Sequence, residues 1–136
     1  MKPYVFEKTD GTKLTIERDT SGRGSYRNQY DLLLKVPNQW ELFKRLDSDD
    51  LFSIHRHIKT YQEDFDKSEI MTFGSIYYHP EVIPRKDCTL KVQVLLDCGC
   101  RRVLLTMIED NTLVSDILIQ HKDIKDFLDS IYCASL

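Results

Sequence analysis

Apolar and polar residues alternate over the first eighteen residues of the chain. Residues 4–8 and 13–18 each alternate, which would place four apolar side chains on one face, those of Tyr4, Phe6, Leu14 and Ile16. An alternation with a period of two is typical of a half-buried strand. Between the two stretches lies Asp10-Gly11, a dipeptide that favours the positive φ angles of a tight turn. The pattern predicts an N-terminal β-hairpin.

The following segment changes from polar to apolar and then to helical spacing. Residues 19–29 are rich in Gly, Ser and Asn and predict a loop, and the apolar run at 30–36 predicts a strand that stops at Pro37. In residues 38–46 the large apolar residues recur every third position, at Trp40, Phe43 and Leu46. This spacing predicts a short helix.

A second, longer helix is predicted from Ser48 to about Phe65. Ser48 is a good N-cap residue, and Asp49 and Asp50 in the first turn suit the positive end of the helix dipole. Five apolar residues keep helical spacing over this stretch, namely Leu51, Ile54, Ile58, Tyr61 and Phe65.

The period returns to two after Glu69. Strands are predicted at 70–78, 89–96, 103–108 and 113–120, and a closing helix at 122–132. The third of these strands is apolar on both faces, which indicates a central strand covered from two sides. We find no internal repeat or linker in the sequence. The whole chain, residues 1–136, is therefore predicted to be one α+β domain, an antiparallel β-meander sheet with two to three helices packed on it.

Composition and charge narrow the class of protein. With 41% hydrophobic and 30% charged residues, the chain has ordinary globular composition. Residues 1–30 hold six basic and four acidic residues, a net of +2, and the rest holds thirteen and eighteen, a net of −5. This balance lacks the broad basic footprint of a nucleic-acid binder and favours a basic protein partner. No signal peptide or membrane span is recognisable, so we expect a cytoplasmic protein with reduced cysteines.

Two short motifs raise the possibility of a metal site. Cys98 and Cys100 flank a glycine in a predicted turn, and thiolates in that position could hold a soft metal ion. His55 and His57 would share a face on a strand but lie about 200° apart on a helix, and the helical pattern is the stronger one. We therefore expect no metal and no cofactor. A metal-dependent enzyme or sensor stays as an alternative.

Carboxylates cluster near both ends of the predicted long helix. The residues are Asp47, Asp49 and Asp50 at one end, and Glu63, Asp64 and Asp66 at the other. Neither cluster has the calcium-loop pattern, so we interpret them as solvated helix ends or as a charged contact surface. Aromatic anchors for a protein partner would come from Trp40, Tyr61 or Tyr77.

Cations and aromatic rings are interleaved in the loop that follows the hairpin. The residues are Arg18, Arg23, Tyr26, Arg27 and Tyr30. Such a loop could hold a phosphate or stack on single-stranded bases, although it lacks the ending of a phosphate-binding loop. Binding of a nucleic acid or nucleotide through this loop is the first alternative function.

No serine or cysteine stands in a recognised nucleophilic context, and we expect no enzyme activity. In size and character alone, the chain resembles bacterial immunity proteins that neutralise a toxin and small phage inhibitors of host defence enzymes. The leading hypothesis is therefore a stoichiometric inhibitor. Its partner would be a basic toxin or nucleic-acid-handling enzyme, and its oligomeric state is left open by the sequence.

Overall fold

The fold repeats one order of elements twice, four strands and then a helix. The computed structural model describes residues 4–7, 11–18, 29–37, 41–63, 69–74, 88–97, 99–109 and 112–135. The first unit consists of β1 (Tyr4–Glu7), β2 (Lys13–Arg18), β3 (Gln29–Lys35), β4 (Leu42–Asp47) and α1 (Ser48–Glu63). The second consists of β5 (Ile70–Phe73), β6 (Thr89–Asp97), β7 (Cys100–Glu109), β8 (Thr112–Ile119) and α2 (His121–Ser135). No repeat is evident in the sequence, so the repetition exists only at the level of elements.

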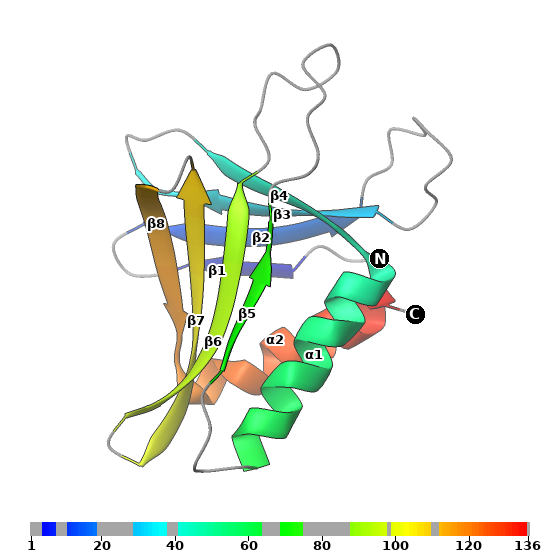
Figure 1. The fold of residues 1–136 in the computed structure, drawn as a ribbon, viewed down its shortest axis with the longest axis vertical. Helices are drawn as coiled ribbons and strands as arrows, with labels where there is room; N and C mark the ends of the chain where they lie inside the picture. The colour runs from blue at the N-terminus through cyan, green and yellow to red at the C-terminus, as the bar shows by residue number, and fades with distance from the viewer. Residues whose placement is uncertain are drawn as a thin grey trace.

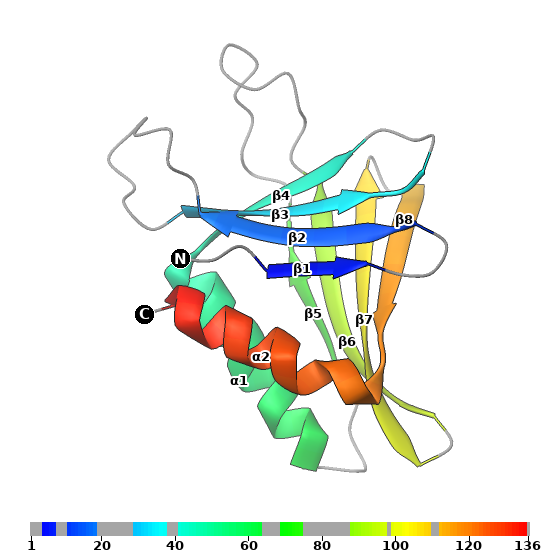
Figure 2. The same ribbon diagram turned by 180° about the vertical axis from the view of Figure 1, so that it is seen from behind.

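The described strands form two antiparallel sheets rather than the predicted single one. Sheet A has the order β1-β2-β3-β4 and sheet B the order β5-β6-β7-β8. Sheet A crosses over one end of sheet B, and both helices lie side by side beneath sheet A (Figure 1, Figure 2). The α+β class and the antiparallel pairing are confirmed. The prediction of one sheet was wrong because α1 separates β4 from β5 and carries the chain into a second layer.

The short helix predicted over residues 38–46 was wrong for its described part, in which residues 42–46 belong to strand β4. Leu33 pairs with Phe43 and Tyr30 with Leu46 in the ladder between β3 and β4. All residues from Leu42 to Leu46 are buried. A strand buried on both faces shows no alternation of apolar and polar residues. The three-residue spacing of Phe43 and Leu46 was therefore mistaken for helical spacing. Trp40 lies outside the described residues.

The remaining elements agree with the sequence patterns. The hairpin pairs Tyr4 with Ile16 and Phe6 with Leu14, as predicted, and Gly11 has a φ of 91°. Strand β7 lies between β6 and β8, which confirms its central position. Its two faces differ, however: Val103, Leu105 and Met107 are buried, whereas the intervening residues are only partly buried. The second face of sheet B is therefore less covered than predicted.

One apolar core joins both sheets and both helices. Sheet A contributes Leu14, Ile16, Leu32 and Leu34, and sheet B contributes Leu90, Val92, Val94, Val103, Leu105, Ile117 and Ile119. The helices contribute Leu51, Ile54 and Ile58 from α1 and Ile124, Phe127, Leu128 and Ile131 from α2. Burial of these side chains is the main source of stability. No helix in the described part of the chain is long and apolar enough to cross a membrane.

Strand β4 connects the two sheets through two polar contacts. The backbone amide of Cys88, just before β6, donates a hydrogen bond to the Phe43 carbonyl at 2.9 Å. The Lys44 ammonium donates to the carbonyl of Gly74, just after β5, at 2.9 Å. Lys44 is only 1% exposed, whereas Gly74 is exposed, so the side chain of Lys44 crosses buried surface to reach a carbonyl at the edge of the core.

Candidate functional site

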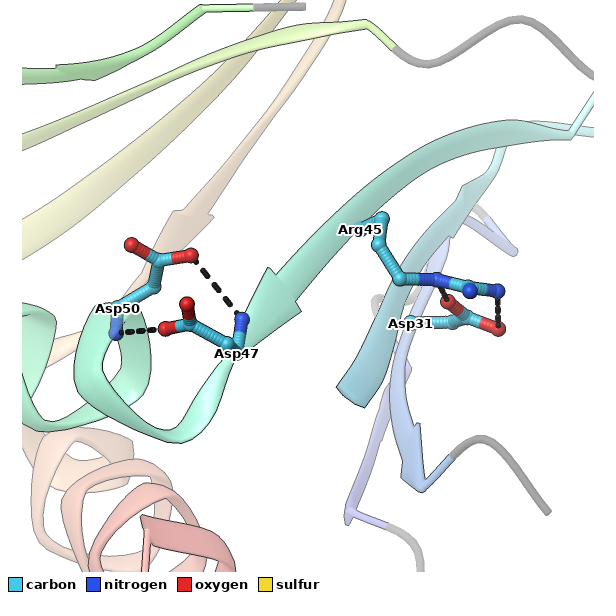
Figure 3. Close-up of polar contacts among 4 residues, drawn as sticks. All are labelled: Asp31, Arg45, Asp47 and Asp50. Atoms are coloured by element: carbon cyan, nitrogen blue, oxygen red, sulfur yellow. Dashed lines mark hydrogen bonds and ion pairs between the residues drawn. The ribbon is translucent and has the colours of Figure 1, made fainter. Parts of the chain in front are cut away.

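The acidic cluster at the start of α1 forms a reciprocal cap. The Asp50 amide donates to Asp47 Oδ1 at 2.7 Å, and the Asp47 amide donates to Asp50 Oδ2 at 3.0 Å (Figure 3). This is the geometry of a capping box, with Asp in the place of the usual Glu or Gln. Asp47 is therefore the N-cap residue, and the prediction that Ser48 caps the helix was wrong by one position. The carboxylates of Asp47 and Asp50 are therefore held in fixed orientations by hydrogen bonds from backbone amides.

Burial and charge both act on Asp50. Partial burial raises the pKa of Asp50, and the nearby carboxylate of Asp47 raises it further. The backbone hydrogen bond between the two residues and the ammonium of Lys44 oppose this shift. Asp49 lies between the two capping residues in sequence and is exposed. The first turn of α1 therefore presents one outward carboxylate and two that are fixed by the cap; we call Asp47, Asp49 and Asp50 the acidic turn.

The two predicted carboxylate clusters can be compared only through the acidic turn and the backbone of Glu63. Helix α1 has 16 residues, which is about 24 Å at 1.5 Å per residue, and the acidic turn and Glu63 lie at its opposite ends. Nothing is described of the Glu63 side chain, and Asp64 and Asp66 lie outside the described residues. The acidic turn is therefore the described part of the predicted partner-binding set.

Of the three predicted aromatic anchors, Tyr61 is the one that the structure describes, and it is buried. The Tyr61 side chain is 9% exposed and belongs to the core, where its ring lies 4.7 Å from that of His57. Its helical spacing placed it on the apolar stripe of α1, and packing uses it there. Trp40 and Tyr77 lie outside the described residues.

The arginine–tyrosine loop is described only at its two ends. Arg18 is the last residue of β2, and its side chain is not described; Arg23, Tyr26 and Arg27 lie outside the described residues. Tyr30 pairs with Leu46 in sheet A and is 4% exposed. The Tyr30 ring is part of the core and offers no platform on which a base could stack.

The helical interpretation of His55 and His57 is confirmed, since both lie in α1. Their rings point to different neighbours: His57 Nε2 lies 3.2 Å from the Glu69 carbonyl, and the His55 ring lies 5.4 Å from that of Tyr132. Cys88 is buried, Cys100 is exposed, and Cys98 lies outside the description. Among the described residues, no three His, Cys, Asp or Glu side chains gather into a metal-binding group.

An ion pair between Arg45 and Asp31 links strands β4 and β3 of sheet A. Arg45 contacts Asp31 on the neighbouring strand through two bonds, Nε to Oδ1 at 2.6 Å and Nη2 to Oδ2 at 3.3 Å (Figure 3). Its guanidinium also lies 5.5 Å from the centre of the Phe43 ring. Because Arg45 is 6% exposed, this two-point contact fixes β3 against β4 and leaves the guanidinium little access to a ligand.

The structure reveals an aromatic surface that sequence reasoning missed. Phe52 on α1 is 49% exposed, and Tyr132 on α2 is 47% exposed. His55, one turn after Phe52, contacts the Tyr132 ring. We call the surface formed by Phe52, His55, Lys59, Asp129 and Tyr132 the helix seam. Phe52 lies off the apolar stripe of α1, so the only sequence signal was a large apolar residue on the polar side of a helix.

Charges on both helices act on His55. Partial burial and the ammonium of Lys59 lower the pKa of His55, while the carboxylate of Asp129 raises it and only partly offsets them. His55 therefore favours its neutral form, in which it packs on Tyr132 without adding a charge to the helix seam.

Comparison with known proteins identifies a shared fold and no family. No family model matches the chain, and no curated protein is significantly similar to it in sequence. A solved structure described as that of the plant transcriptional regulator PBF-2 superposes with a TM-score of 0.53. The match covers 98% of this chain and 80% of that chain, at 12% sequence identity. At that identity the likeness shows the fold alone.

Proposed function

We propose that this chain is a non-catalytic protein-binding module that inhibits or neutralises a basic partner, in the manner of an immunity or anti-defence protein. The observation that carries this proposal is the acidic turn at the start of α1. Its capping bonds hold two carboxylates in place beside an exposed third one. A charged surface that is ordered before binding loses less conformational freedom when the partner arrives.

Charge supports a basic partner rather than an acidic one. Residues 31–136 carry thirteen basic and eighteen acidic residues, a net of −5, and three of these acidic residues are concentrated in the acidic turn. Complementary charge steers association and disfavours wrong partners. A toxin or a nucleic-acid-handling enzyme with a basic active site fits this requirement.

Reversal of the exposed charge tests the proposal. The wild-type protein is immobilised, the source lysate is passed over it at low salt, and the retained protein is identified and purified for titration. We expect Asp49→Lys to weaken binding of that partner by at least about tenfold, a change of about 1.4 kcal/mol. Asp49 is preferred to Asp47 and Asp50 because its replacement leaves the cap intact.

Asp116→Lys is the matched control, because Asp116 is an exposed aspartate on β8, away from α1. Binding of the control variant should match that of the wild type. Equal affinities of the Asp49→Lys variant and the wild type at low salt would remove the acidic turn as the contact surface.

A second candidate is binding of nucleic acid, and one observation favours it. The solved structure with the same fold is described as a transcriptional regulator. The residues concerned are Arg23 and Arg27 of the loop between β2 and β3. A low-salt titration with single-stranded oligonucleotides should show salt-sensitive binding that the double variant Arg23→Ala/Arg27→Ala abolishes. A flat titration of the wild type would exclude this candidate.

A further inference from the structure

The helix seam exposes two large rings that no described residue covers from the solvent side. Phe52 and Tyr132 are each about half exposed, although each belongs to a helix whose opposite face is fully buried in the core. Isolated exposed apolar residues are ordinary. Here, however, Phe52 and Tyr132 lie toward the same end of the helix pair. The ring centres of His55, one turn after Phe52, and Tyr132 are 5.4 Å apart.

The two helices run in opposite directions along the seam (Figure 1, Figure 2). Residues that follow His55 along α1 therefore lie beside residues that precede Tyr132 along α2. Lys59 comes one turn after His55, and Asp129 comes one turn before Tyr132, so the two charges share one level; both influence the His55 ring. The seam thus has an aromatic end and a charged end, with a cation on α1 and an anion on α2.

We propose that two copies of this chain associate through the helix seam, about a two-fold axis that runs along it. Such an axis places α1 of one copy over α2 of the other and keeps each residue at its own level along the helices. Lys59 of one copy then faces Asp129 of the other, and the aromatic ends meet each other. This inference goes beyond the proposed function, which uses the acidic turn.

Charges outside the seam are basic on this part of α1 and mixed on α2. Arg56 is exposed on α1, next to Lys59, whereas the exposed residues of α2 before Asp129 include both Lys125 and Asp126. The opposite charges that would face each other are therefore those of the seam itself, Lys59 on α1 and Asp129 on α2. A surface with a cation on one half and an anion at the same level on the other half is complementary to its own copy after a half-turn, which argues for a second copy rather than an unrelated partner.

Two single charge reversals and their mixture test this arrangement. In Lys59→Glu both charges of the seam are negative, and in Asp129→Lys both are positive, so each variant should associate with itself at least about tenfold more weakly than the wild type. An equimolar mixture of the two variants should regain association, because each reversed charge then faces an opposite one. Sedimentation equilibrium over a range of concentrations measures all three samples.

The mixture separates contact between copies from contact within one copy. A role of Lys59 and Asp129 confined to a single chain would alter the stability of each variant, but mixing would restore nothing. Lys13→Glu, at an exposed lysine on β2, is the matched control and should associate like the wild type. Two further variants, Phe52→Ser and Tyr132→Ser, should each associate more weakly than the wild type in the same sedimentation experiment. Circular dichroism checks that both variants are folded.

The outcomes distinguish this inference from the proposed function. A wild-type protein that sediments as a monomer at every concentration overturns the two-fold contact, and so does a dimer whose variants are not rescued by mixing. Neither result affects binding of a target at Asp49. Conversely, if Asp49→Lys binds the target as tightly as the wild type, the proposed function fails and the sedimentation results are unchanged.

Discussion

At the scale of single residues, the acidic turn shows how one short motif combines a structural role and a surface role. Asp47 and Asp50 satisfy each other's backbone amides, which otherwise lack partners at the start of a helix. Asp49, between them, makes none of these bonds. The sequence shows three similar aspartates; only the direction of each side chain separates the two caps from the exposed charge.

Removal of the cap should destabilise the protein measurably. We expect Asp47→Ala to lower the free energy of unfolding by about 1 kcal/mol, because the Asp50 amide loses its acceptor. Asp47→Ser should retain most of the stability, since Ser is also a good N-cap residue. Urea denaturation of the three proteins measures the difference. Equal losses in both variants would show that the carboxylate charge, and not the cap, is what matters at this position.

The raised pKa of Asp50 predicts a pH dependence with a definite sign. The ordinary pKa is 3.8, and the folded state raises it, so the folded protein binds this proton more readily than the unfolded chain. The contribution of Asp50 to stability is therefore fully present below pH 3.8 and is lost as the pH rises through the raised pKa.

The variant Asp50→Asn isolates this contribution, because Asn keeps an acceptor oxygen for the Asp47 amide and cannot ionise in this range. The stability of the wild type relative to Asp50→Asn should fall as the pH rises from about 3 to 7 and should then level off. Denaturant titrations of both proteins at each pH measure the difference. A relative gain of the wild type over the same range would contradict the raised pKa.

At the scale of elements, the apolar stripe of each helix determines which side packs on the core. The residues off that stripe form the exposed surface of the helix. Leu51, Ile54 and Ile58 follow helical spacing and are buried, as the pattern predicts. Strand β4 is the opposite case. Because both of its faces are covered, its sequence carries no period of two, and the helical spacing of its large residues was misleading.

The contact between α1 and α2 should weaken in acid through His55. The ordinary pKa of histidine is 6.5, and the folded state lowers it for His55. Stability from this group is therefore present above pH 6.5 and is lost as the pH falls through the lowered pKa. Lys59 on α1 and Asp129 and Tyr132 on α2 are the groups that face the ring.

A comparison with His55→Gln measures this effect. Between pH 7.5 and 5 the melting temperature of the wild type should fall more than that of the variant, which has no ionisable group at this position. Parallel melting curves at all pH values would show that protonation of His55 is not linked to folding.

At the scale of the whole molecule, β4 holds the two sheets together. The ammonium of Lys44 reaches from sheet A to the carbonyl of Gly74 beside sheet B, and the amide of Cys88 reaches back to Phe43. A buried charge is costly unless hydrogen bonds satisfy it. Lys44 therefore ties the orientation of the sheets to a polar contact at the edge of the core.

Two substitutions separate the packing of Lys44 from its charge. Lys44→Ala removes the buried stem and the hydrogen bond, and we expect it to lower the free energy of unfolding by roughly 2–4 kcal/mol. Lys44→Met keeps most of the side-chain volume and removes the buried ammonium, so it should lower the free energy of unfolding clearly less than Lys44→Ala does. Chemical denaturation measures both. Equal losses would show that the hydrogen bond to Gly74 outweighs the packing of the stem.

The sequence by itself determined the α+β class, the antiparallel hairpins and both helices, because these depend on local periodicity and turn residues. The long alternation at Leu90, Val92 and Val94 and the glycine turns at Gly11 and Gly99 are examples. Each signal is contained within one or two neighbouring elements, so it can be read without knowledge of the remaining chain.

Only the tertiary structure decided the division into two sheets, the strand identity of β4 and the composition of the helix seam. Phe52 and Tyr132 are far apart in sequence, but α1 and α2 run in opposite directions (Figure 2), and His55, one turn after Phe52, contacts the Tyr132 ring. Tyr30 and Tyr61 were candidates for a binding surface as well as members of apolar patterns, and only the packing shows that both belong to the core. Which apolar residues are buried depends on the other elements that cover them, and that information lies in the packing of distant segments rather than in any local pattern.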